Sequence, residues 1–134
     1  MLENFNFSAA ITQPLIDGQA ALGCQAGLWL LHHYLDESHY ISQSLKTPEG
    51  SWWHAIMHRM EGDYGNSKYW YRSIGSHKSM ELIREQFTQI DGNPNWDVFE
   101  FVDACQQNDP RAHKYAQLEW QLLFDHCFHL AIGQ

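Results

Sequence analysis

The chain has 134 residues, the size of one domain with a single hydrophobic core. Its 44% hydrophobic and 14% aromatic residues exclude an intrinsically disordered protein, because disorder requires few aromatic side chains and dense charge. The formal net charge of −8 argues against a nucleic-acid-binding protein, which would need a basic face toward the phosphates. We therefore expect one domain over residues 1–134, with an irregular N-terminal arm over residues 1–17.

Periodic apolar residues, interrupted by proline and glycine, predict an all-α fold: a helical bundle of about five or six helices. No stretch alternates between apolar and polar residues for long enough to predict a strand. From residue 19 to residue 45 the apolar spacing fits one long helix. The other expected helices cover residues 48–61, 64–74, 76–90 and 98–108, and a last one begins at residue 110.

Several expected helix boundaries carry recognisable end signals. Thr47 can accept a hydrogen bond from a free backbone amide, and Pro48 suits the first helical position. Ser76 or Ser79 is expected to cap the helix that ends near residue 90. The Asp-Gly-Asn-Pro sequence at 91–94 predicts a turn, because these residues tolerate or fix the backbone angles of a turn.

The sequence predicts neither a signal peptide nor a membrane-spanning segment. The first basic side chain is Lys46, whereas a signal peptide begins with a positively charged segment. The most apolar run, residues 20–31, is shorter than the ~20 residues of a spanning helix. The three cysteines lack C-x-x-C spacing, which is typical of reduced thiols. We therefore expect a cytoplasmic protein with no membrane and no nucleic acid among its partners.

Histidines and carboxylates at helical spacing suggest a metal site. His54, His58 and Glu61 stand at i, i+4 and i+7, so they share one face of a helix. Two imidazoles one turn apart can bind the same divalent metal. Asp36 and His39 precede them on the neighbouring expected helix. The candidate metal ligands are therefore His54, His58, His39 and Asp36; alternatively, these histidines only pair with backbone groups or carboxylates.

The segment 51–72 crowds aromatic rings beside charged and amide side chains, which is the composition of a polar ligand site. His54 or His58 would act as general acid or base, since histidine titrates nearest neutral pH. Glu61 or Asp63 would complete the catalytic set by orienting that histidine. Alternatively, this segment is an aromatic core held together by ion pairs. The expected ligand-binding residues are Trp53, Arg59, Asn66, Lys68, Trp70 and Arg72.

This segment also resembles a motif of an uncharacterised family of short bacterial and fungal helical proteins. In that family W-H-A-I-M-H-R is followed by an acidic turn and then by N-x-K-Y-W. Met60 departs from the pattern, because the family often has a second arginine there. The resemblance implies no function, since the family has no assigned activity. The matching residues are 53–59, Glu61, Asp63, Asn66 and 68–70.

Two functions stay open from the sequence. The first is a small-molecule-binding helical domain for a polar, anionic or hydroxyl-rich ligand, which would be an enzyme if it used histidine acid–base chemistry or a histidine–carboxylate metal site. The second is a non-catalytic protein-interaction domain with an aromatic docking surface. A pocket would enclose Trp53 and Trp70, whereas a docking surface would leave the rings exposed.

Overall fold

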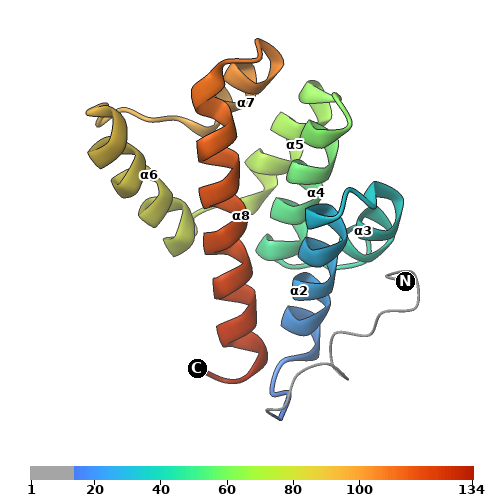
Figure 1. The fold of residues 1–134 in the computed structure, drawn as a ribbon. Helices are drawn as coiled ribbons and strands as arrows, with labels where there is room; N and C mark the ends of the chain where they lie inside the picture. Colours follow the sequence, from blue (N-terminus) through green and yellow to red (C-terminus); the bar gives the residue numbers. More distant parts are fainter. Residues whose placement is uncertain (1–13) are drawn as a thin grey trace.

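A computed structural model describes residues 14–134, and these form seven α-helices and no strand (Figure 1). The all-α prediction is confirmed, whereas the expected number of five or six helices is slightly too low. The long α8 lies in the middle of the view in Figure 1, between α6 and the group α2–α5. The helices are α2 (Gly18–Leu31), α3 (Leu35–Ser42), α4 (Pro48–Met60), α5 (Tyr64–Ile74), α6 (Lys78–Asp91), α7 (Val98–Gln106) and α8 (Pro110–Ala131).

The prediction of one helix over residues 19–45 is wrong, because the chain turns between α2 and α3. His33 adopts a left-handed conformation with φ of 64°. The amide of His33 donates to the carbonyl of Leu30, and that of Tyr34 donates to the carbonyl of Trp29. This pair of bonds is the Schellman arrangement that ends many helices, usually with glycine at the left-handed position. With histidine there, neither glycine nor proline marked the break in the sequence.

The predicted helix starts are correct in one case and wrong in another. The Thr47 hydroxyl accepts from the amide of Gly50 at 3.0 Å, and Pro48 opens α4 as expected. Neither Ser76 nor Ser79 caps α6. Instead, the His77 Nδ1 atom accepts from the amide of Ser79 at 3.1 Å. At the predicted turn 91–94, Gly92 ends α6 with φ of 71°, in the left-handed region.

The residues of the expected N-terminal arm fall into two groups. Residues 1–13 lie outside the described part of the chain, whereas residues 14–17 precede the first described helix. The backbone amides of Ile16 and Asp17 both donate to the carbonyl of Ala131. The Asp17 side chain then caps α2 by accepting from the amide of Ala20. The start of α2 is therefore fixed to the end of α8.

Trp53 fills the contact between α2 and α4. Its ring is fully buried, and a Cβ atom built on Gly27 would lie 2.6 Å from the ring. Gly23 faces the same ring and the Cys127 sulfur. Only residues without a side chain allow the α2 backbone to approach so large a ring. The glycines in this apolar helix thus serve packing.

A buried polar network joins α4, α5 and α8. The carboxylate of Glu119 accepts from Arg59 Nη1 at 2.7 Å, from Trp52 Nε1 at 2.9 Å and from the Tyr71 hydroxyl. Burial raises the pKa of the Tyr71 phenol well above its usual value, so the hydroxyl keeps its proton and donates it. A buried ion pair depends on such additional hydrogen bonds, because both charges have lost their water. This network fixes the position of α4, which carries the histidines described below.

No helix within residues 14–134 is long and apolar enough to cross a lipid bilayer.

Candidate functional site

Three histidines from two helices converge on one point. His39 lies on α3, whereas His54 and His58 lie one turn apart on α4. The Nε2 atoms of His39 and His54 are 3.1 Å apart. One potential ligand atom from each of the three side chains lies within 4.8 Å of the other two. His54 and His58 lie on one face of α4, as their spacing predicted. The neighbouring helix contributes His39, so three imidazoles come together.

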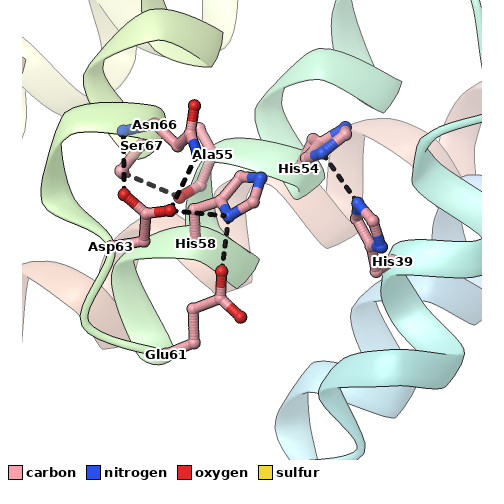
Figure 2. Close-up of polar contacts among 8 residues, drawn as sticks. All are labelled: His39, His54, Ala55, His58, Glu61, Asp63, Asn66 and Ser67. Carbon is pink, nitrogen blue, oxygen red and sulfur yellow. Dashed lines mark hydrogen bonds and ion pairs between the residues drawn. The ribbon is translucent and has the colours of Figure 1, made fainter.

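The donor atoms fit a small divalent ion. In a tetrahedral zinc site with Zn–N distances of 2.0–2.1 Å, ligand nitrogens lie roughly 3.3 Å apart. The observed separation of 3.1 Å between the Nε2 atoms of His39 and His54 is close to that edge. In Figure 2 both of these nitrogens point into the space between α3 and α4, and the outer nitrogen of the His58 ring faces the same side. The third imidazole, His58, has a potential ligand atom within 4.8 Å of both.

The Glu61 carboxylate holds His58 from the side of the ring opposite the other two histidines. The Nδ1 atom of His58 lies 2.6 Å from Glu61 Oε1 and 3.9 Å from Asp63 Oδ2. Figure 2 shows both carboxylates on the side of the ring that faces away from His54 and His39. A carboxylate at Nδ1 keeps the proton there, which leaves the Nε2 lone pair available to a metal. Glu61 therefore sets both the tautomer and the orientation of the ring.

The Asp63 carboxylate is occupied mainly by its own helix. It caps α5 by accepting from the backbone amide of Asn66, and it also accepts from the Asn66 side chain at 2.7 Å. These hydrogen bonds lower the pKa of Asp63, which therefore stays charged. Asn66, predicted to bind ligand, thus lies beside the histidines but is bonded to Asp63.

His54 is the buried member of the group. Its side chain is 4% exposed and stacks on Trp70, with ring centroids 3.9 Å apart. Burial, together with the nearby His58 and His39, lowers the pKa of His54 to about 4. The ring is therefore neutral at pH 7 and does not need to lose a proton before it binds a metal. Its Nδ1 atom is buried and has no hydrogen-bond partner in the described part of the chain, an arrangement that costs roughly 1–3 kcal/mol.

Four of the predicted ligand-binding residues lie away from the histidines. Trp53 packs against α2, and Arg59 belongs to the buried network with Glu119. Lys68 forms an ion pair with Asp103 at 2.6 Å, and Arg72 lies over the ring of Phe99 on α7. Helical spacing explains this separation, because residues at consecutive positions point to different sides of a helix. The structure brings together Trp70, Asn66 and the histidine group, and it places the remaining four elsewhere.

Asp36 also lies apart from the histidines. It is exposed on α3 and lines a hollow together with Leu22 and Trp29 of α2. Within residues 14–134 it belongs to none of the groups of converging metal-ligating atoms. Although Asp36 and His39 are three residues apart on α3, His39 reaches His54 on α4, whereas Asp36 lies at the hollow beside α2.

A second histidine cluster was missed by the sequence reasoning. Glu49 Oε2 lies 2.7 Å from His77 Nε2 and 3.1 Å from His126 Nε2. The three residues come from the first turn of α4, the cap of α6 and the last third of α8. His77 lies 28 residues and His126 lies 77 residues after Glu49 in the chain, so no local spacing could have revealed the cluster. The hydrogen bonds from His126 and His77 hold the pKa of Glu49 far below its usual range.

The cysteines offer no reactive thiolate. Cys24, Cys105 and Cys127 are free thiols. Burial raises the pKa of the Cys24 thiol to about 12, and it raises those of Cys127 and Cys105 as well. Since the thiolate is the nucleophilic form, the raised pKa values disfavour it in all three at neutral pH.

The chain matches no protein-family model, and neither a curated protein nor a solved structure matches it. The functional argument therefore rests on the geometry of the two histidine clusters.

Proposed function

We propose that this protein binds one divalent metal ion, with zinc as the first choice, through His39, His54 and His58, and that the ion acts on a small polar molecule. The observation that carries the proposal is the convergence of three imidazoles whose facing nitrogens have few protein partners. Among residues 14–134, the Nε2 atoms of His39 and His54 have only each other as hydrogen-bond partners, at 3.1 Å. In a pair of neutral imidazoles, one Nε2 atom donates a hydrogen bond and the other accepts it. The pair therefore has one N–H for its two facing nitrogens.

The chemistry of the residues supports zinc over harder ions. Imidazole suits zinc and other late transition metals, whereas magnesium and calcium prefer oxygen ligands. Three histidine ligands leave a fourth position open, which is the pattern of catalytic rather than structural zinc sites. An ion held in this way supplies a Lewis acid and a bound water that ionises near neutral pH.

The surrounding residues would prepare the ligands. Glu61 fixes the proton of His58 on Nδ1. Trp70 covers one face of His54 and removes it from water, which keeps that ring neutral. Asp63, charged and partly exposed beside His58, adds negative charge behind that ring and is itself held by Asn66. In this proposal the histidines and carboxylates have roles at the site, whereas Trp53, Arg59, Lys68 and Arg72 have none.

The experiment is a metal-binding measurement on untagged protein. Protein purified without chelator is analysed for metal content, and the apo form is titrated with Zn²⁺ in competition with a chromophoric chelator. We expect about one ion per chain in the wild type and loss of binding in the variants His54→Gln and His58→Gln. His113→Gln is the matched control, because His113 is an exposed histidine on α8 outside both clusters.

Cobalt substitution adds a readout of geometry. Co²⁺ in a four-coordinate histidine site absorbs strongly in the visible range, whereas six-coordinate Co²⁺ absorbs weakly. An intense spectrum that disappears in His58→Gln would support the proposal. If apo protein binds neither ion more tightly than His58→Gln does, the proposal is wrong.

A further inference from the structure

The second histidine cluster borders a cavity. A cavity of about 500 Å³ lies between α6 and α8. Its size falls within the range of small-molecule sites, roughly 300–1,000 Å³. It is lined by Lys78, Ser79, Leu82, Leu122, Asp125, His126, His129, Leu130 and Gln134. His126 belongs to both the cavity wall and the cluster with Glu49.

Glu49 fixes the orientation of His126 in this wall. The Nε2 atom of His126 lies 3.1 Å from Glu49 Oε2, so it donates its hydrogen to the carboxylate. Its ring also packs edge to face against His77, with centroids 4.6 Å apart. The other nitrogen, Nδ1, makes no hydrogen bond within residues 14–134. The cavity thus has one imidazole held in place from behind, with its second nitrogen available to a ligand.

The remaining lining is divided between charge and apolar surface. Lys78 supplies a fixed positive charge at the start of α6, and His129 adds a second imidazole. Among the lining residues that the structure describes, Asp125 has the only carboxylate side chain, and it accepts from the Gln121 side chain at 3.0 Å. Leu82, Leu122 and Leu130 provide an apolar wall.

We propose that the cavity between α6 and α8 binds a small organic acid. Its carboxylate would pair with Lys78 and accept from a ring N–H of His129, whereas the Nδ1 lone pair of His126 can only accept and would take a hydroxyl of the acid. Its apolar body would lie against Leu82, Leu122 and Leu130. Charge-assisted hydrogen bonds select the carboxylate, and the buried apolar area adds affinity that a simple inorganic anion would lack. This site is separate from the metal site and stands whether or not the protein binds zinc.

The test is a titration with matched probes, followed by NMR on the full chain. The probe is 2-naphthoate; 2-naphthamide has the same shape without the charge, and acetate has the charge without the apolar body. We expect 2-naphthoate to saturate the protein and to shift amide signals in residues 78–82 and 122–130. Each of the other two probes should bind at least about tenfold more weakly, because each lacks one half of the interaction.

Two exposed lysines provide the matched variants. Lys78→Gln should weaken 2-naphthoate binding about tenfold, whereas Lys114→Gln, on an exposed part of α8, should leave it unchanged. Both side chains are at the surface, so both variants should fold. The proposal is wrong if 2-naphthamide binds as well as 2-naphthoate, if Lys78→Gln has no effect, or if the shifted signals lie elsewhere. Failure to saturate at the solubility limit of the probe would also overturn it.

Discussion

The two histidine clusters use the same residue types but place their protons differently. In the cluster of Glu49, His77 and His126, both Nε2 atoms point at one carboxylate oxygen. In the cluster of His39, His54 and His58, the facing nitrogens point at one another, and the nearest carboxylate, Glu61, lies behind the His58 ring. In the first arrangement a carboxylate lies between the imidazoles, whereas in the second the facing nitrogens of His39 and His54 are hydrogen-bonded to each other.

The proton positions in the Glu49 cluster follow from the backbone. The amide of Ser79 can only donate, so His77 Nδ1 must accept, and the proton of the neutral ring lies on Nε2. A ring that accepts at Nδ1 and donates at Nε2 has no lone pair left for a metal. His58 has the opposite state, because Glu61 holds the proton on Nδ1. The proposed metal site therefore rests on the proton positions of its histidines: the proton of His58 lies away from the other two rings, and the one between His39 and His54 would have to leave or move to Nδ1.

The largest expected effect is the stabilisation of the protein by zinc. With free Zn²⁺ about 1,000-fold above its dissociation constant, the free energy of unfolding should rise by about 4 kcal/mol, because the ion binds only the folded chain. His54→Gln and His58→Gln should abolish this increment. Denaturant unfolding with and without Zn²⁺ measures it for each variant.

The same measurement on the other cluster provides the contrast. His77→Gln and His126→Gln should lower the stability of the apo protein but keep the zinc increment. Loss of the increment in these two variants, with retention in His54→Gln, would reverse the assignment of the two clusters.

The second effect concerns the stability of the apo protein. Glu49→Gln removes the charge from an acceptor that serves two imidazole donors in a partly buried position. Since hydrogen bonds to charged groups contribute about 1.5–3 kcal/mol each and neutral ones about 1, we expect a loss of about 3 kcal/mol at neutral pH. Glu61→Gln is the matched control, because Glu61 is more exposed and holds one imidazole. Equal losses in both variants, measured by urea unfolding with chelator present, would contradict the comparison.

The fold could be predicted from the sequence wherever local signals existed. Thr47 with Pro48, Gly92 and Pro110 marked helix ends that the structure confirms. The break at His33 could not be predicted, because a left-handed histidine is uncommon and the apolar pattern continues across it. The cap at His77 was missed for a similar reason, since serine is the more usual capping residue.

The candidate site was predictable only in its local part. The spacing of His54 and His58 on one helix indicated a shared face, and Glu61 followed from the same spacing. The rest of the site could not be predicted, because it depends on tertiary packing. Arg59 is adjacent to His58 in sequence, yet its side chain reaches Glu119 on α8, which is 60 residues away. Pairing across such distances decides which polar residues are structural, and no local spacing encodes it.

The third effect is a pH dependence that separates the two clusters. The pKa of His54 is about 4 in the folded protein and about 6.5 in the unfolded chain. Between these values the unfolded state binds a proton that the folded state does not, so stability falls as the pH decreases. From neutral pH to about pH 5 the loss should be about 2 kcal/mol in the apo protein.

The contribution of Glu49 has a different window. Its pKa is lowered in the folded state, so its stabilisation is lost only as the pH falls below about 4.5, the usual range of a glutamate. The part of the stability change between neutral pH and pH 5 that is absent in His54→Gln therefore reports on His54. The variant His54→Gln should flatten this part of the profile, and a profile that keeps the wild-type slope would show that His54 is not the group concerned.

The smallest effect is the one that tests how Glu61 acts. If Glu61 holds His58 for a metal, Glu61→Gln should weaken zinc binding about tenfold, because the partner behind a ligating histidine sets its tautomer and basicity. The stability of the apo protein should change by less than about 1 kcal/mol, since the pair is near the surface. Asp63→Asn tests the neighbouring carboxylate, which lies 3.9 Å from the same nitrogen and is bonded mainly to Asn66. It should reduce zinc affinity less than Glu61→Gln does. An unchanged affinity in Glu61→Gln, together with a loss in Asp63→Asn, would move the orienting role from Glu61 to Asp63.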